Sequence, residues 1–369
     1  MKGIFYVQMY FMCKCIKCNN KIIFNGPNKN ASVEHIIPNA IGGKLKSSKL
    51  LCKKCNSDYG KECDSALCKQ LEFITVMLNP SRDRQTNLTF KTSSNEKYDI
   101  SLNGKPVLKK PQIKQEKNGD HIHYKIISRS RAEANQILKN IKKKYPNLDI
   151  ESVKNNIISS KEYINEGINI DIKLGGELFL KAIYKIILEY YIENGGNPKN
   201  TELYDKNIHI FALSQFIFDK YTKDTINHGI FIKGDPKEKY LIGYVELYKA
   251  YRYIVLLDDN YNGDYIESYY CYDLFNNKHL DNIFIEPNIN LKTLYEKNLK
   301  NLNNNITNSI KDNLNTLLFL LLKRQHEMVL NDIIDASIKK YTDNPSEDFT
   351  KILMSNLTPY IISLIKNVE

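Results

Sequence analysis

The 369-residue sequence lacks any run of about 18 apolar residues, so we expect no membrane-spanning helix. It also lacks tryptophan, so any stacking on nucleic-acid bases would use tyrosines such as Tyr269, Tyr270 and Tyr272. For these tyrosines, packing in the fold is the default interpretation. The apolar start, residues 4–12, contains Gln8 and two tyrosines, and no small-residue cleavage site follows it. We therefore expect a strand or a docking segment there and not a signal peptide.

Cysteine is scarce outside one end of the chain. Seven of the eight cysteines lie between residues 13 and 68, and Cys271 stands alone. A disulfide scaffold would distribute cysteines through a small secreted chain. Clustering at one end of a longer chain indicates metal binding in a reducing compartment, and we expect a cytoplasmic protein.

Acidic residues are too few to balance the basic ones. The chain has 53 Lys and Arg against 42 Asp and Glu, a net charge of +11. Residues 1–68 alone hold 11 lysines and only four acidic residues. This excess favours a polyanionic partner, with DNA expected first and RNA as an alternative. A basic protein with no nucleic-acid partner stays open.

Length and pattern together predict an α+β protein with three parts and no internal repeat. Residues 1–77 are expected to form a zinc-binding module, 78–290 an α+β domain for recognition or regulation, and 291–369 a helical C-terminal region interrupted at Pro359. The patterns predict strands at 87–92, 98–102, 121–127, 208–213, 229–233, 240–245 and 253–257, a hairpin turn at 103–104, and helices at 63–77, 131–145 and 177–191.

Two Cys-x-x-Cys pairs, Cys15 with Cys18 and Cys52 with Cys55, have the spacing of a four-thiolate structural zinc site. Cys13 would replace Cys15 only with a less suitable loop. The remaining cysteines of this segment, Cys63 and Cys68, are interpreted as small core residues.

Between the two pairs lies Glu34-His35, followed by Ile36-Ile37-Pro38 and Gly42-Gly43. Hydrolysis of a phosphodiester needs a base to activate water, and a neutral histidine serves near pH 7. It also needs a divalent metal ion, and Mg²⁺ prefers oxygen ligands such as those of Glu34 and Asn56. Asn56 follows Cys55 directly, so a bound zinc ion would fix its place relative to His35.

These motifs resemble the HNH, or ββα-metal, endonucleases in their four-cysteine version. They look most like the subtype with Asn after the last cysteine, as in phage recombination endonuclease VII. The resemblance implies a zinc-braced ββα unit with His35 as general base. It also implies that Glu34 and Asn56 bind the catalytic Mg²⁺ or Mn²⁺.

The sequence departs from the family at Ser47, where many members have an asparagine that supports the histidine loop. Asp64 is an additional candidate ligand of the catalytic metal. Nearby lysines are expected to bind the nucleic-acid backbone without reading its sequence: Lys44, Lys46, Lys49, Lys53 and Lys54. The run Lys142-Lys143-Lys144 is either a further phosphate contact or a solvated helix face.

The sequence therefore predicts a metal-dependent DNA endonuclease of restriction, phage defence or a mobile element, acting as a monomer or a homodimer. Two alternatives stay open: a catalytically inactive zinc module that binds nucleic acid, and an RNA-cleaving or trigger-activated toxin nuclease. Binding alone would need none of Glu34, His35 and Asn56, which favours the enzyme.

Overall fold

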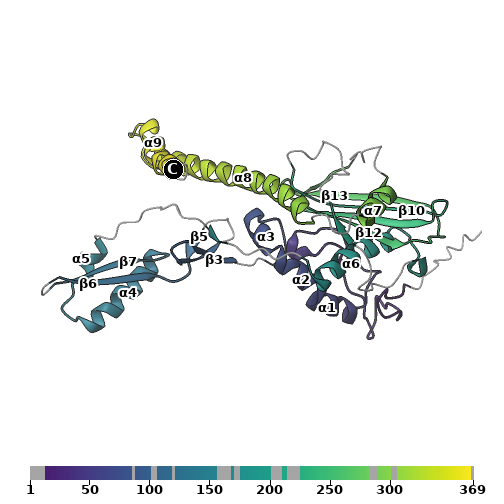
Figure 1. Cartoon of the computed structure of the whole chain (residues 1–369). Coiled ribbons are helices and arrows are strands. Elements are labelled where there is room, and N and C mark those ends of the chain that lie inside the picture. The colour runs from purple at the N-terminus through teal and green to yellow at the C-terminus, as the bar shows by residue number, and fades with distance from the viewer. Residues whose placement is uncertain are drawn as a thin grey trace, which may run out of the picture. The chain divides into compact units, whose positions relative to one another are not determined.

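The computed structural model describes residues 13–84, 88–100, 106–118, 121–155, 168–169, 175–200, 210–213, 225–281, 290–300 and 306–366. The chain forms two compact units, each from two separate stretches of sequence (Figure 1). Unit 1 is Met1–Gln85 with Ile172–Leu321, and unit 2 is Thr86–Asp171 with Leu322–Glu369. The mixture of helices and strands fits the expected α+β class. The three consecutive domains expected from the sequence stay a prediction.

Unit 1 starts with a small module, residues 13–84, which we call the head. Its first strand, β1 (Glu34–His35), pairs antiparallel with β2 (Lys46–Ser47). The helical elements of the head are η1 (Asn39–Ile41), α1 (Lys53–Lys61), α2 (Cys63–Gln70) and α3 (Glu72–Leu78). The order strand, strand, helix is the one that the resemblance to ββα-metal nucleases implies.

The turn between β1 and β2 requires glycine at two successive positions. Gly42 has a φ angle of +96°, in the left-handed region that favours glycine. At Gly43, a Cβ atom would lie 1.8 Å from the carbonyl oxygen of Ile37. The double glycine seen in the sequence thus lets the chain fold back closely after His35.

The rest of unit 1 is built on a six-stranded antiparallel sheet with strand order β14-β13-β10-β11-β12-β9. Its strands are β9 (Ile210–Ala212), β10 (Asn227–Asp235), β11 (Tyr240–Leu247), β12 (Tyr251–Asp258), β13 (Ile266–Asp273) and β14 (Lys278–His279). A short 3-10 turn, η2 (Pro198–Asn200), precedes them.

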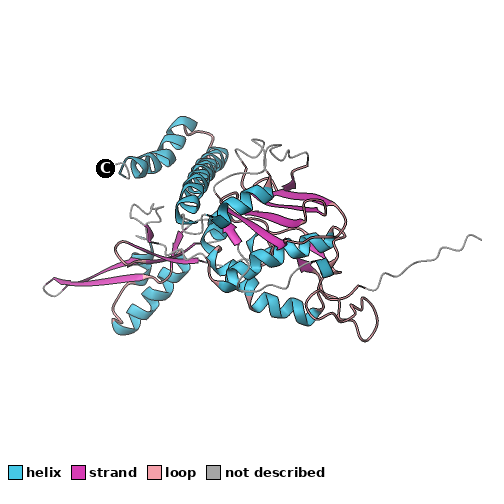
Figure 2. Cartoon of the chain, turned by 45° about the vertical axis from the view of Figure 1, so that its right-hand side comes forward, coloured by secondary structure: helices cyan, strands magenta, loops and turns pink. Residues whose placement is uncertain are grey.

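Alternating side chains give this sheet two apolar faces. On β10, Ile230 and Ile232 belong to one hydrophobic cluster, whereas Phe231 belongs to a second one. Helix α6 (Glu177–Glu193) covers the first face and α7 (Leu291–Lys300) covers the second. Figure 2 shows helices (cyan) beside the strands (magenta) of this sheet.

A buried side chain of β10 and one from the turn between β11 and β12 hold the turn of the head. The Nε2–H group of His228 donates to the carbonyl oxygen of Ile41 at 2.8 Å, and the Tyr248 hydroxyl donates to the same oxygen at 2.9 Å. The backbone N–H of Tyr248 donates to Nδ1 of His228, which fixes this tautomer. Burial lowers the pKa of His228 to about 4, so the ring stays neutral. The head is therefore packed into unit 1.

Unit 2 contains a four-stranded antiparallel sheet, β5-β4-β3-β8, and a two-stranded hairpin, β6-β7. Its strands are β3 (Leu88–Thr92), β4 (Lys97–Ile100), β5 (Pro106–Leu108), β6 (Gln112–Asn118), β7 (His121–Ile127) and β8 (Ile168–Asn169). Its helices are α4 (Arg131–Lys144), α5 (Ile150–Asn155) and α9 (Phe349–Lys366). Helix α8 (Ile306–Asp343) contributes to both units.

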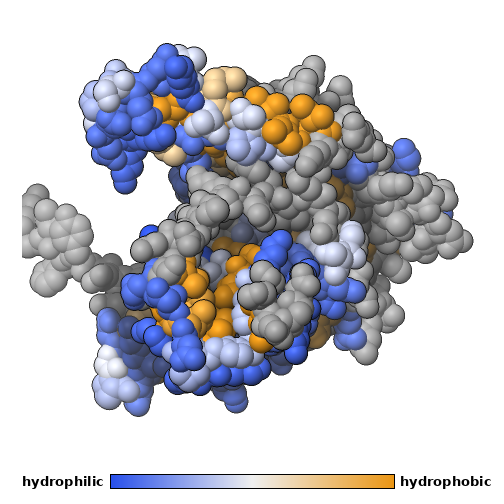
Figure 3. Space-filling model, turned by 90° about the vertical axis from the view of Figure 1, so that its left-hand side faces the viewer, coloured by the Kyte–Doolittle hydropathy of each residue, from blue (hydrophilic) through white to orange (hydrophobic). Residues whose placement is uncertain are grey.

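Within unit 2, the C-terminal part of α8 is joined to α9 by a hydrogen bond between His326 and the hydroxyl of Tyr360. They also expose apolar side chains, among them Met354, Ile362 and Ile365. In the upper part of Figure 3, orange apolar residues lie beside blue polar ones. Unit 2 thus presents an apolar helical surface.

Most of the expected elements are present. The helices expected at 131–145 and 177–191 are confirmed as α4 and α6, and the helix expected at 63–77 is divided into α2 and α3 at Leu71. The interruption expected at Pro359 is wrong, because α9 continues through it and its neighbour Tyr360 is buried. The hairpin turn at 103–104 and the segment 4–12 lie outside the described residues. No helix in the described ranges is long and apolar enough to cross a membrane.

Candidate active site and zinc site

The two predicted cysteine pairs come together in the head. One sulfur atom from each of Cys15, Cys18, Cys52 and Cys55 lies within 4.8 Å of the other three. The sulfur atoms of Cys18 and Cys52 are 3.8 Å apart. A tetrahedral zinc site with Zn–S bonds of about 2.3 Å separates its sulfurs by about 3.8 Å, so the geometry fits Zn²⁺.

Local backbone contacts bring the two pairs together. The N–H group of Ile16, inside the first pair, donates to the carbonyl oxygen of Leu50, just before the second pair. Asn19 turns the chain after Cys18 with a φ angle of +59°. Burial, with hydrogen bonds among the thiols, raises the pKa of Cys55. Zn²⁺ would supply the positive charge that four thiolates need.

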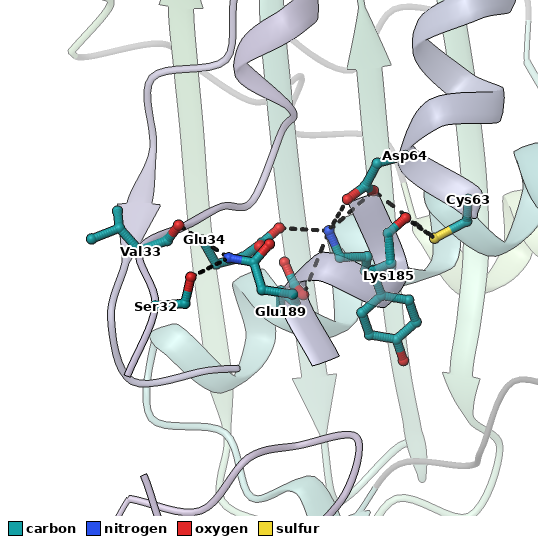
Figure 4. A network of polar contacts seen from close by, with 9 residues as sticks. Ser32, Val33, Glu34, Cys63, Asp64, Lys185 and Glu189 are labelled. Carbon is teal, nitrogen blue, oxygen red and sulfur yellow. Dashed lines mark hydrogen bonds and ion pairs between the residues drawn. The ribbon is translucent and has the colours of Figure 1, made fainter. Parts of the chain in front are cut away.

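Glu34 is directed into the interior of unit 1. Its side chain is 3% exposed, and Oε1 accepts a hydrogen bond of 2.6 Å from Nζ of Lys185 on α6. The same Nζ donates to Oδ2 of Asp64 at 2.9 Å and to Oδ1 at 3.1 Å. It also lies 5.6 Å from the ring centre of Tyr59 on α1. Figure 4 shows Lys185 between the two carboxylates.

Glu189, one turn after Lys185 on α6, completes this buried cluster. Its carboxylate is fully buried, 3.7 Å from Nζ of Lys185, and neither oxygen has a hydrogen-bond partner in the described part of the chain. Burial raises the pKa of Glu189 well above its usual range, so it keeps its proton to higher pH. Burial also raises the pKa of Glu34 and Asp64, although Lys185 opposes this. One ammonium facing Glu34 and Asp64 leaves an excess of negative charge when both are ionised.

His35 points to the other face of the short strand β1. Its Nε2 atom is buried and has no hydrogen-bond partner among the described residues. Burial lowers the pKa of His35, and Lys46 and Lys44 lower it further, whereas Asp83 raises it. The imidazole therefore stays neutral to lower pH than an exposed histidine, as a general base requires.

Asn56 lies in the first turn of α1. Its Nδ2 group donates to the hydroxyl of Ser32 at 2.9 Å and to the carbonyl oxygen of Val33 at 3.1 Å. These bonds tie Asn56 to the residues just before Glu34. Within the described ranges, no group donates to Oδ1 of Asn56 or to Oε2 of Glu34. Both oxygens are of the type that Mg²⁺ and Mn²⁺ prefer, so this donor set fits a divalent cation.

Ser47 connects the head to α6. Its hydroxyl donates to Oε2 of Glu193 at 2.5 Å and accepts a hydrogen bond from the N–H group of Lys49. Glu193 is the last residue of α6. The loop between β2 and α1 is thus held by α6.

The five lysines expected to contact nucleic acid are not equivalent. Lys46, Lys49, Lys53 and Lys54 are exposed, and Lys53 and Lys54 form the first turn of α1. Lys44 is half-buried and donates to the carbonyl oxygen of Ser81 at 2.5 Å, a contact within the head. Four of the five are therefore available at the surface of the head.

Sequence reasoning missed Lys185, Glu189 and Glu193, which all lie on α6. The helix itself was expected, with packing as its role. A signal was present: Lys185 and Glu189 are four residues apart and lie among apolar residues, where an isolated charge is costly. Their partners Glu34 and Asp64 are more than 100 residues away, so the pairing follows only from the fold.

Comparison with known proteins agrees with this geometry. Residues 15–72 match a family model described as HNH endonuclease. The match includes both cysteine pairs and extends through α2, so this part of the chain fits an HNH zinc module. The match also suggests that the protein is a nuclease. No curated protein and no solved structure matches the chain.

Proposed function

We propose that this chain is a metal-dependent endonuclease that hydrolyses phosphodiester bonds of DNA. His35 is its general base, and Glu34 and Asn56 hold the catalytic metal ion. The observation that carries the proposal is the environment of His35, on the strand that also carries Glu34. Its Nε2 atom has no hydrogen-bond partner among the described residues, its pKa is lowered, and lysines lie nearby. A histidine with only a packing role would usually have its ring nitrogens hydrogen-bonded.

In this mechanism Nε2 of His35 accepts a proton from water, and the resulting hydroxide attacks the phosphorus atom. Mg²⁺ or Mn²⁺, when bound, would polarise the phosphate and stabilise the leaving oxygen. Glu34 and Asn56 each offer an oxygen with no hydrogen bond from the described residues. The excess negative charge around Glu34 also favours a cation there.

The surface of the head supports a phosphate backbone as the partner. Lys53 and Lys54 lie in the first turn of α1, which contains no acidic residue. Two lysines at the N-terminus of a helix are unfavourable, because the helix dipole is positive at that end. A bound phosphate would interact favourably with both lysines and with the helix end. Lys46 and Lys49, on β2 and just after it, are further exposed lysines of the head. Restriction, phage defence or a mobile element would suit such a nuclease, in the cytoplasm and as a monomer or homodimer.

Cleavage of a supercoiled plasmid tests the proposal. Purified protein is incubated with Mg²⁺, Mn²⁺ or EDTA, beside His35→Ala and a matched control, His279→Ala, in an exposed histidine of β14. We expect metal-dependent nicking or linearisation by the wild type and by the control, and a loss of about 100-fold or more in His35→Ala. Equal cleavage by His35→Ala and the wild type would exclude this site.

The alternatives predict other outcomes of the same assay. A module that only binds would retain DNA in a mobility-shift experiment without cutting it. A ribonuclease would cut a matched RNA substrate and leave the DNA intact. A trigger-activated toxin would become active only with a further factor.

A further inference from the structure

Glu34 lies on a very short strand of the head. Strand β1 has two residues and pairs with a strand of two residues. A glutamate side chain has three rotatable bonds, and fixing them costs conformational entropy that so short a strand does not offset. A metal-ligating carboxylate needs an additional contact that fixes its orientation.

Lys185 provides that contact. Its Nζ group lies 2.6 Å from Oε1 of Glu34, within the range of a charge-assisted hydrogen bond, and both side chains are 3% exposed. This bond engages only Oε1 of the carboxylate. Oε2 accepts no hydrogen bond from the described residues.

Lys185 is itself fixed from two sides. Asp64 of α2 accepts two hydrogen bonds from its ammonium group, and the ring of Tyr59 lies against it. On the other side, α6 is anchored in the sheet, where Ile187 packs against Gly243 of β11. The position of Glu34 thus depends on a helix that lies 151 residues away in the sequence.

We propose that Lys185 is a positioning residue for the nuclease reaction. It holds Glu34 through Oε1, so that Oε2 and the amide oxygen of Asn56 stay oriented for the divalent metal ion. The inference rests on the proposed function and goes beyond it, because it assigns part of the active site to α6. The head then has a correctly oriented metal site only when it is docked on the rest of unit 1.

Lys185→Met tests this, because methionine keeps the apolar length of the side chain and removes the ammonium group. Mn²⁺ binding is measured by calorimetry on the zinc-loaded protein, with plasmid cleavage followed in parallel. We expect Mn²⁺ affinity to fall by about tenfold or more, with a similar loss of cleavage at limiting metal. Lys185→Arg, which keeps the charge, should lie between the variant and the wild type.

The matched control is Lys181→Met, one turn earlier on α6. Lys181 is partly exposed, and its carboxylate partner, Glu62, is 3.9 Å away. The Lys181→Met variant should bind Mn²⁺ and cleave DNA as the wild type does. Zinc content and circular dichroism verify that each variant is folded. If Lys185→Met does not fold, the measurement rests on Lys185→Arg, whose larger guanidinium changes the contact with Oε1 of Glu34 and should still weaken Mn²⁺ binding.

Unchanged or tighter Mn²⁺ binding in a folded Lys185 variant would overturn the inference, since Lys185 would then be a structural residue or a competitor of the metal. In that case His35-dependent cleavage by the wild type would leave the proposed function intact. A wild type that neither cuts nor binds Mn²⁺ would overturn both. Weaker Mn²⁺ binding in the variant supports the inference even under conditions in which cleavage is too slow to measure.

Discussion

Two side-chain clusters of unit 1 differ in how the sequence encodes them. The cysteine cluster is assembled from two Cys-x-x-Cys pairs inside the head, and this spacing is typical of a metal site. The cluster around Lys185 combines Glu34 and Asp64 of the head with Lys185 and Glu189 of α6. The first cluster stabilises the head by itself, and the second joins it to the rest of unit 1. Loss of the first should therefore unfold the head, and loss of the second should loosen its attachment.

The largest effect is expected from the zinc site. Cys52→Ser should reduce bound zinc from one ion per chain to almost none and unfold the head. Structural zinc contributes about 10–16 kcal/mol in zinc-finger peptides, as much as the whole stability of a typical domain. Metal analysis and limited proteolysis measure both changes. Cys68→Ser is the control, because Cys68 lies outside the cluster and is half-buried. Full zinc content in Cys52→Ser would mean that the four sulfurs do not form the site.

A smaller effect is expected from the Lys185 cluster. Removing one partner of a buried ion pair costs about 3–5 kcal/mol, because the remaining charges lose their compensation. Lys185→Met should lower the free energy of unfolding of unit 1 by that amount in urea denaturation while zinc stays bound. Lys181→Met should cost less than about 1 kcal/mol, because its pair is exposed. Equal losses in the two variants would remove the distinction between a buried cluster and a surface pair.

The two clusters also show which site residues can be predicted from the sequence and which cannot. Cys15, Cys18, Cys52 and Cys55 could be predicted as one site, because zinc imposes a local spacing. The helix α6 could be predicted from its apolar period. Its polar partners could not, because Lys185 meets Glu34 only after the six-stranded sheet has formed and α6 has packed on it. Residue type therefore indicated Glu34 as a ligand, but the fold decides what holds it.

The neutral contact of His228 with the carbonyl oxygen of Ile41 can be compared with the charged contact of Lys185 with Glu34. The pKa of His228 is about 4 in the folded protein and about 6.5 when unfolded. Between these values the unfolded chain binds more protons, so stability falls as the pH falls, by about 3 kcal/mol at pH 4. His228→Gln should lack this pH-dependent loss of stability. Urea denaturation of both proteins from pH 7 to pH 4 measures the difference. Parallel curves would show that His228 does not titrate on unfolding.

The smallest effect concerns the apolar face of α6, opposite to the cluster. A Cβ atom at Gly243 would lie 2.2 Å from Cγ2 of Ile187, so Gly243→Ala forces α6 away from the sheet. Such overpacking costs about 1–3 kcal/mol. Gly60→Ala, in α1 with open space around it, should instead be neutral or stabilise by up to about 1 kcal/mol. If α6 transmits its position to Glu34, Gly243→Ala should also weaken Mn²⁺ binding, which calorimetry would detect. A loss of stability without a change in Mn²⁺ affinity would mean that the Lys185 cluster keeps its geometry when the helix shifts.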